Sequence, residues 1–289
     1  MHYEGNIFRP PSEADSILLQ VTTGCSHNKC TFCGMYKGSR FTIKDDATIM
    51  ADIDFAARYC QRQSHLFLCD GDALIIPQQR LVHILATIRQ KLPWVKRIGL
   101  YANTKGIKMK SAEQLRELQQ LGLTIAYMGL ESGDDVTLAR INKGADAARM
   151  IAMGQKIRAA GIKLSITVLL GIADRERSAI HARATGKVLS AIDPEYVGAL
   201  TLMLTPGTIA HDEYLAGSRS LPGPQEMLAE LSEMFTHTEL SNGLFHANHA
   251  SNYLPIKARL PRDKDKVLAL LDAALHGKVE LKPEYLRGL

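Results

Sequence analysis

The sequence predicts an α/β fold in which six strand-then-helix units are followed by a helical C-terminal extension. Short apolar runs of strand length alternate with longer segments whose apolar residues recur at helical spacing. This alternation implies parallel strands joined by crossover helices. Six units, where a closed barrel has eight, indicate an incomplete, laterally open barrel, although a doubly wound open sheet has the same alternation. The six expected strands are 16–21, 65–69, 97–101, 124–130, 163–170 and 196–204.

The first three helices carry recognisable start and stop signals. Acidic residues lie early in 45–58, where they suit a helix N-terminus. Proline is favourable at the start of 77–91. Ser111 opens the next helix, and Gly122 is a plausible residue to end it.

The later helices follow the same logic up to about residue 215. Segments 134–141 and 146–160 come after the fourth strand, and 175–191 leads to the sixth. Polar or glycine-bearing groups follow strands one, two, four, five and six. In a parallel barrel all those strand ends lie on one face, where active sites form.

The pattern changes after residue 215. Pro222–Gly223–Pro224 interrupts the chain, and helices are expected at 225–240 and 263–275. We therefore expect a barrel domain of residues 1–215 and an α-rich extension of residues 216–289 that covers the barrel opening. A polar stretch at 245–253 could cap the open side and touch substrate, or it could anchor a loop.

The bulk composition is that of a globular protein with a sizeable core. The 289 residues are 46% hydrophobic and 22% charged, and the net charge is +5. The basic residues form no block of like charges, so a nucleic-acid partner is not indicated. No apolar run is long enough to span a bilayer and no signal-peptide pattern begins the chain, so we expect no membrane partner and a cytoplasmic protein. Five cysteines, three of them bunched, favour metal binding in a reducing compartment over disulfides.

The most informative segment is Thr22–Tyr36, which directly follows the first strand. It places Cys25, Cys30 and Cys33 within nine residues. Thiolates are the usual ligands of iron–sulfur clusters, which normally take four of them, so three would leave one iron open. The alternative is a structural zinc site that adds His27, although this spacing lacks two well-separated ligand pairs.

These residues resemble the radical S-adenosylmethionine (SAM) superfamily. Its members hold a [4Fe–4S] cluster with three cysteines, and SAM chelates the fourth iron. The usual spacing is Cys-x3-Cys-x2-Cys, and this chain has Cys-x4-Cys-x2-Cys. The resemblance covers about residues 16–210 and favours a partial (β/α)6 TIM-like barrel over the open sheet. It implies that Cys25, Cys30 and Cys33 are the cluster ligands.

The resemblance also implies a SAM site. Phe32 keeps the aromatic residue before the last cysteine and would lie near the adenine. Asp70–Gly71–Asp72 stands where the family carries a motif that receives the SAM amino group, and carboxylates suit an ammonium. The segment Tyr127–Gly133 is similar to the Gly-Leu-Glu-Ser-Gly segment of the coproporphyrinogen oxidase and methylthiotransferase branch. There Glu131 would accept from SAM hydroxyls or the amine, and Ser132 would assist, although Ser132 also suits a helix N-cap.

The implied reaction is reductive cleavage of SAM to a 5′-deoxyadenosyl radical that abstracts hydrogen from a small-molecule substrate. The electron would come from a donor such as flavodoxin or ferredoxin. Only Cys60 and Cys69 remain, so a methylthiotransferase with a second cluster is disfavoured. Two other hypotheses stay open. One is an iron–sulfur electron-transfer or SAM-binding protein without radical catalysis, and the other is a zinc-stabilised nucleotide- or RNA-binding barrel.

Overall fold

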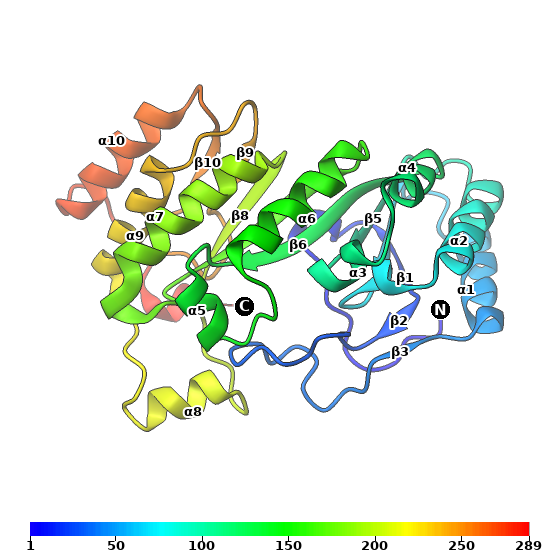
Figure 1. Cartoon of the computed structure of the whole chain (residues 1–289), viewed down its shortest axis with the longest axis horizontal. Helices are drawn as coiled ribbons and strands as arrows, with labels where there is room; N and C mark the ends of the chain where they lie inside the picture. The colour runs from blue at the N-terminus through cyan, green and yellow to red at the C-terminus, as the bar shows by residue number, and fades with distance from the viewer. Residues whose placement is uncertain (289) are drawn as a thin grey trace. The chain divides into compact units, whose positions relative to one another are not determined.

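The computed structural model describes residues 1–288 and has a mixed α/β fold built on a mostly parallel eight-stranded sheet (Figure 1). The strand order is β1-β4-β5-β6-β7-β8-β9-β10. Contacts divide the chain into two compact units. The first unit contains residues 1–28, 35–128 and 156–164, and the second contains residues 29–34, 129–155 and 165 onwards.

The first unit contains the strands that lead to the candidate site. Its parallel register pairs Leu19 of β1 with Leu68 of β4, and Leu68 with Leu100 of β5. Its strands are β1 (Ile17–Gln20), β4 (His65–Cys69), β5 (Arg97–Tyr101) and most of β6 (Leu123–Glu131). Its helices are α1 (Asp46–Tyr59), α2 (Gln78–Lys91), α3 (Thr104–Lys108) and α4 (Ala112–Gln120), with short 3-10 turns at Pro11–Glu13 and Ala73–Ile75.

Helix caps and apolar faces explain why these segments are helical. The Asp45 side chain accepts from the amide of Thr48 at the start of α1. Ser111 and Gln114 form a capping box at the start of α4, each side chain bonding the other residue's amide. The buried face of α1 repeats Ile49, Ile53 and Ala56, as expected for an amphipathic helix.

A two-stranded ribbon closes the base of the cysteine segment in the first unit. β2 (Thr22–Thr23) runs antiparallel to β3 (Thr42–Ile43), pairing Thr22 with Ile43. The Thr23 and Thr42 hydroxyls are 2.6 Å apart. The loop of residues 24–41 therefore begins and ends at this ribbon, which is separate from the eight-stranded sheet.

The second unit contains the end of the sheet and the helices around it. Val168 of β7 pairs with Ala199 of β8, and Val197 of β8 pairs with Phe245 of β9, all in parallel. Its strands are most of β7 (Lys163–Leu170), β8 (Tyr196–Thr201), β9 (Leu244–His246) and the antiparallel β10 (Lys257–Arg259). Its helices are α5 (Asp135–Arg140), most of α6 (Ala147–Ala159), α7 (Asp174–Ile192), α8 (Ile209–Leu215), α9 (Pro224–Thr236) and α10 (Lys264–Leu275), followed by a 3-10 turn at Glu284–Leu286.

Helices α7 and α9 pack closely in the second unit because a glycine faces the contact. A Cβ on Gly186 would lie 2.7 Å from the carbonyl oxygen of Met234. Phe235 of α9 packs edge-to-face on Phe245 of β9 with ring centroids 5.1 Å apart. The helix pair and the end of the sheet thus share one apolar core.

The predicted α/β fold class and all six predicted strands are confirmed. The sixth strand is shorter than expected and ends at Thr201, and the helix predicted at 225–240 ends at Thr236. The C-terminal segment also adds β9 and β10 to the sheet, whereas only helices were expected there. These strands have three residues each, too few for an alternating pattern to show. The division at residue 215 stays a prediction.

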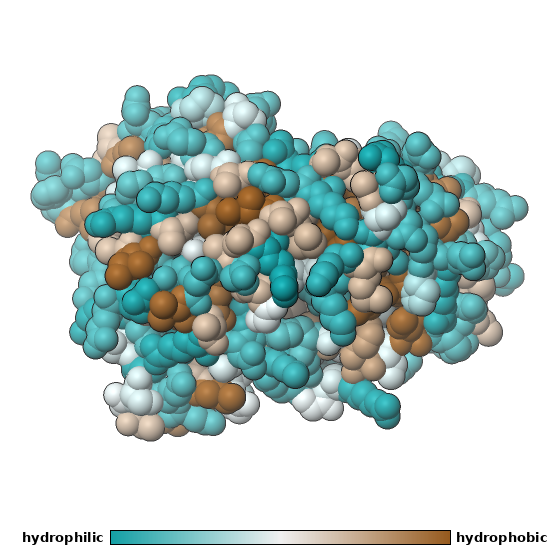
Figure 2. All heavy atoms as spheres, viewed as in Figure 1, coloured by the Kyte–Doolittle hydropathy of each residue, from teal (hydrophilic) through white to brown (hydrophobic). Residues whose placement is uncertain are grey.

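The outer surface carries no large apolar band on the side in view. Figure 2 shows a mainly hydrophilic face with small groups of apolar side chains. Within residues 1–288, no helix has the length and apolar character needed to cross a bilayer.

Candidate functional site

In the first unit, the turn after β4 lies directly against the first loop cysteine. The amide of Gly71 donates to the carbonyl of Gly24 at 3.1 Å. A Cβ on Gly71 would lie 3.0 Å from Cβ of Cys25 and 2.9 Å from the ring of Tyr36. Only glycine fits this approach without displacing the loop. The structure therefore brings together two motifs that are 46 residues apart in the sequence, Cys25 and Gly71.

Asp70 is a buried carboxylate held by several donors. Its Oδ2 accepts from Nε2 of Gln20 at 2.9 Å, and its backbone amide donates to Oγ1 of Thr22 at 3.0 Å. The Tyr36 hydroxyl lies 3.5 Å from the other carboxylate oxygen. Burial raises the pKa of Asp70 above its usual value, against the hydrogen bonds and the positive charge of Lys44.

Asp72 is also fully buried, and its carboxylate joins a small polar network. Ser26 donates from its hydroxyl to Oδ2 of Asp72 at 2.6 Å. Asn103, which follows β5, donates from Nδ2 to the Ser26 hydroxyl at 2.8 Å. Burial raises the pKa of Asp72 to about 6. This network ties the ends of β4 and β5 to the residue that follows Cys25.

In the second unit, the other two loop cysteines flank an apolar anchor. Thr31 donates its amide to the carbonyl of Ile141 at 3.0 Å, and its carbonyl accepts from the amide of Ala210 at 3.0 Å. Phe32 packs on a buried apolar cluster that includes Leu169 and Leu202. Phe32 thus packs near the end of β7 and the residue that follows β8, and a contact of Phe32 with adenine stays a prediction.

Glu131 and Lys143 form a mostly buried ion pair in the same unit. Nζ of Lys143 is 2.9 Å from Oε1 of Glu131, and Glu131 has a left-handed backbone with φ 65°. A Cβ on residue 129 would lie 2.1 Å from that oxygen, so Gly129 makes room for the carboxylate. Burial lowers the pKa of Lys143, but Glu131 and the sulfurs of Cys30 and Cys33 outweigh it and the net shift is upward. Lys143 therefore remains a cation near two of the loop thiols.

Ser132 lies deeper than its neighbour and joins a structural network. Its hydroxyl is 2.8 Å from Nδ1 of His181, and it accepts from the amide of Asp134 at 3.0 Å. Nε2 of His181 is 3.4 Å from Glu230, whose carboxylate accepts from the amide of Gly171 at 2.7 Å. The N-cap of α5 is Asp134, whose side chain accepts from the amide of Thr137, so Ser132 is not the cap. A contact of Ser132 with SAM stays a prediction.

The sequence of residues 19–184 matches the Radical SAM superfamily. This span is more than half of the chain and contains the three loop cysteines, Asp70–Gly71–Asp72 and Glu131. The chain belongs to the radical SAM superfamily. This membership confirms the expectation that the chain is an enzyme, and it does not identify the substrate.

Known relatives share the fold at low identity. A 4′-phospho-dehydrooxetanocin synthase from Priestia megaterium is 23% identical over an alignment of 172 residues that covers 54% of this chain and 23% of the relative. The radical S-adenosylmethionine methyltransferase TsrM from Kitasatospora setae aligns with a TM-score of 0.58 at 20% identity, over 72% of this chain and 41% of TsrM. Coproporphyrinogen III oxidase (HemN) from Escherichia coli, a radical SAM enzyme, aligns with a TM-score of 0.56 at 16% identity, over 76% of this chain and 51% of HemN. This chain spans less than two thirds of the length of each of them.

The cysteines of this radical SAM chain fall into two groups. Cys25, Cys30 and Cys33 are half-buried thiols on a loop, which suits soft metal ligands. Cys60 ends α1, and Cys69 is buried in β4, where burial raises its pKa. Among residues 1–288, no three Cys, His, Asp or Glu side chains are gathered closely enough to hold a metal ion. The donor chemistry of the loop fits a cluster, and the ligand set stays a prediction.

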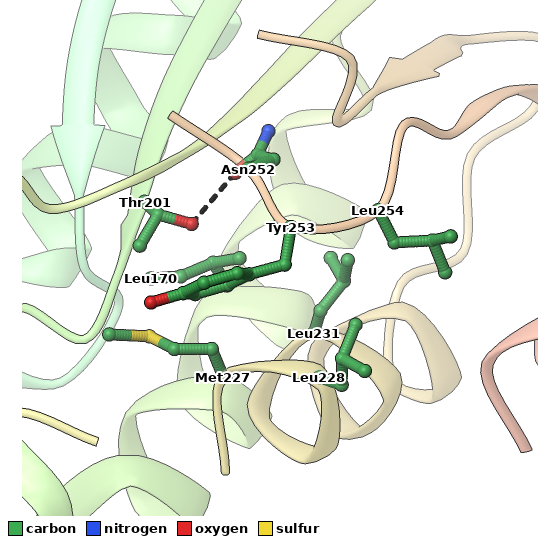
Figure 3. Close-up of a pocket in the computed structure, with 8 residues that line it drawn as sticks. All are labelled: Leu170, Thr201, Met227, Leu228, Leu231, Asn252, Tyr253 and Leu254. Atoms are coloured by element: carbon green, nitrogen blue, oxygen red, sulfur yellow. Dashed lines mark hydrogen bonds between the residues drawn. The ribbon is translucent and has the colours of Figure 1, made fainter. Parts of the chain in front are cut away.

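The polar stretch at 245–253 is anchored to the sheet (Figure 3). Ser251 and Asn252 are buried, and Oδ1 of Asn252 accepts from the Thr201 hydroxyl at 2.8 Å. Nδ2 of Asn252 donates to the carbonyl of Ala199 at 2.7 Å. The ring of Tyr253 lies between Leu170 and the α9 side chains in a small apolar cavity. The loop-anchor interpretation therefore holds for these residues.

Several site residues were not predicted from the sequence. Gln20, Tyr36 and Asn103 surround the two aspartates, and Lys143 pairs with Glu131. Gln20 had a usable signal, because a polar residue at the end of an apolar strand needs a buried partner. The other three lie in loops or turns, and their partners are distant in sequence.

Proposed function

We propose that this chain binds a [4Fe–4S] cluster through Cys25, Cys30 and Cys33 and binds SAM beside it. The observation that carries the proposal is the approach of Gly71 to Cys25 in the first unit. A turn rich in carboxylates then lies next to a cluster ligand, which suits a small molecule whose amino group must be held near the metal. The bound cluster and SAM would supply the radical chemistry, namely reductive cleavage of SAM to methionine and a 5′-deoxyadenosyl radical that abstracts hydrogen from a small molecule.

The protein's own residues would bind and orient these groups. Asp70 and Asp72 offer carboxylate oxygens to an ammonium, and their existing donors fix the orientation of both side chains. Glu131 would accept hydrogen bonds from SAM, and its pairing with Lys143 holds it in place. The positive charge of Lys143 near two thiols would offset the negative charge of thiolate ligands. Phe32 and the apolar cluster around it would exclude water.

Anaerobic reconstitution followed by reduction with dithionite tests this function. The wild-type protein is expected to bind iron and sulfide and to release 5′-deoxyadenosine from SAM. Cys30→Ala should lose both the cluster and the product. Cys60→Ala is the matched control, because Cys60 lies at the end of α1, and it should keep both.

The results also separate the other hypotheses. A reconstituted cluster with no 5′-deoxyadenosine would contradict radical catalysis and favour electron transfer or SAM binding alone. Zinc without iron or sulfide would favour the zinc-stabilised barrel. Equal product from wild type and Cys30→Ala would refute the ligand assignment.

A further inference from the structure

The cysteine segment lies in an unusually long stretch without acidic residues. Between Asp15 and Asp45 the sequence contains no Asp or Glu. The same stretch contains four basic residues and one histidine, together with all three loop cysteines. These basic residues are Lys29, Lys37, Arg40 and Lys44, and the histidine is His27.

In the first unit, Lys37 and Arg40 lie in the same loop as Cys25. We call this part of the chain, residues 22–28 and 35–43, the cationic loop (Figure 1). Its base is the β2–β3 ribbon. A Cβ on Gly24 would lie 3.3 Å from the backbone of Arg40. Nζ of Lys37 donates to the carbonyl of Asn28 at 3.3 Å, and Nδ2 of Asn28 donates to the carbonyl of Tyr36 at 2.9 Å.

The outer side of the cationic loop is open to solvent. Lys37 and Arg40 are exposed, and Met35 beside them is 41% exposed. Lys44, in contrast, is buried and reaches Glu4 at 3.5 Å. An exposed apolar side chain among exposed cations is the composition of a small polar interface rather than of a folded core.

We propose that the cationic loop is the docking surface for an acidic one-electron carrier protein. The proposal rests on the proposed function, which requires an electron to reach the cluster. Transient electron-transfer complexes are small and are formed largely by opposite charges. A basic surface beside Cys25 would attract an acidic carrier and orient it toward the metal ligands, and the net charge of +5 adds to this attraction.

A nucleic acid is the competing polyanion, and the loop suits it less well. Single-stranded nucleic acids are bound by cations combined with exposed aromatic rings on which bases stack. Tyr36, the aromatic residue between Met35 and Lys37, is only 6% exposed and packs edge-to-face on Phe8. The loop therefore offers charge without a stacking surface at this position.

The experiment compares the double variant Lys37→Glu/Arg40→Glu with a control of equal charge change, Arg62→Glu/Lys96→Glu. Arg62 and Lys96 are exposed and precede β4 and β5, which run parallel. Cys25 lies near Gly71, which follows β4, so the control residues are at the opposite ends of these strands. A purified acidic flavodoxin is the probe. Its dissociation constant is measured by calorimetry at low and high salt, and 5′-deoxyadenosine formation is measured with reduced flavodoxin and, separately, with dithionite.

We expect the loop variant to bind flavodoxin at least about 10-fold more weakly at low salt, with the difference shrinking as salt rises. Its dithionite-driven rate and iron content should match the wild type, and the control variant should bind normally. Equal weakening in both variants, or salt-independent binding, would overturn the docking surface. Binding of total tRNA that the loop variant loses, with no flavodoxin binding, would assign the surface to RNA instead. If dithionite yields no product, the proposed function fails, and the calorimetry still decides the docking surface.

Discussion

The close approach of Gly71 to Cys25 leads to a quantitative prediction for Gly71→Ala. The added methyl group would lie 2.9 Å from the Tyr36 ring, 3.0 Å from Cβ of Cys25 and 3.0 Å from the carbonyl oxygen of Gly24. Carbon atoms normally pack at about 3.5–4.0 Å, so the neighbours must move by roughly 0.5–1 Å. Two of the three atoms belong to the backbone or to a Cβ and cannot rotate away. Overpacking of this kind costs about 1–3 kcal/mol, and we expect a value near the upper end.

Thermal unfolding of the apo protein measures this cost. At about 2–4 °C per kcal/mol, a loss of about 3 kcal/mol lowers Tm by about 6–12 °C. Iron content after reconstitution should fall as well, because the Cys25 loop is displaced. Gly198→Ala in β8 is the matched control, since its added methyl group would find its nearest neighbour at 3.7 Å. Wild-type Tm and iron content in Gly71→Ala would refute the reasoning.

Three further predictions concern the buried polar groups. Asp72→Asn should flatten the dependence of stability on pH. The pKa of this carboxyl rises from 3.8 to about 6 on folding, so the wild-type protein loses roughly 3 kcal/mol of stability as pH rises between those values. Tm measured from pH 4 to 7 should therefore fall less in the variant than in the wild type. Ser132→Ala should cost about 1–3 kcal/mol in urea unfolding, because Nδ1 of His181 loses the nearer of its two hydroxyl partners and the amide of Asp134 loses its acceptor. Ser132→Thr should recover part of this loss, and an unchanged midpoint would mean that the network contributes no net stability. Lys143→Met should lower the midpoint potential of the reconstituted cluster, because a nearby cation favours the more negative reduced state, and Lys143→Arg should leave the potential unchanged. A redox titration followed by electron paramagnetic resonance measures this potential. Equal potentials in wild type and Lys143→Met would contradict this placement of the charge.

The regular elements could be predicted because their signals are local. Helix α4 has a capping box and an apolar face within nine residues. In β7, buried apolar residues alternate with more polar ones before an apolar end, and its predicted bounds match the structure. The elements that were missed are short. Helix α3 has five residues and begins at an Asn103 cap, and β9 and β10 acquire strand geometry only by pairing with β8 and with each other.

The candidate site was predictable only in part, because only some of its residues give a local sequence signal. Cysteine spacing and carboxylates after strands are local patterns, so Cys25, Asp70 and Glu131 could be named from the sequence. Their supporting contacts are long-range. The bond between Gln20 and Asp70 spans 50 residues, and its existence depends on the parallel pairing of β1 with β4. The glycines that permit these contacts, such as Gly129, give no sequence signal of the atoms they face.

The C-terminal strands also determine which strand forms one end of the sheet. The sheet is open, with β1 and β10 as its end strands, and an exposed strand edge is a template for pairing with another chain. β10 has only three residues, two of them Lys257 and Arg259, and Pro261 follows shortly after. Shortness, positive charge and proline all discourage edge-to-edge pairing. Without β9 and β10 the longer, half-buried strand β8 would become the edge, so a fragment ending before Leu244 is expected to aggregate through β8.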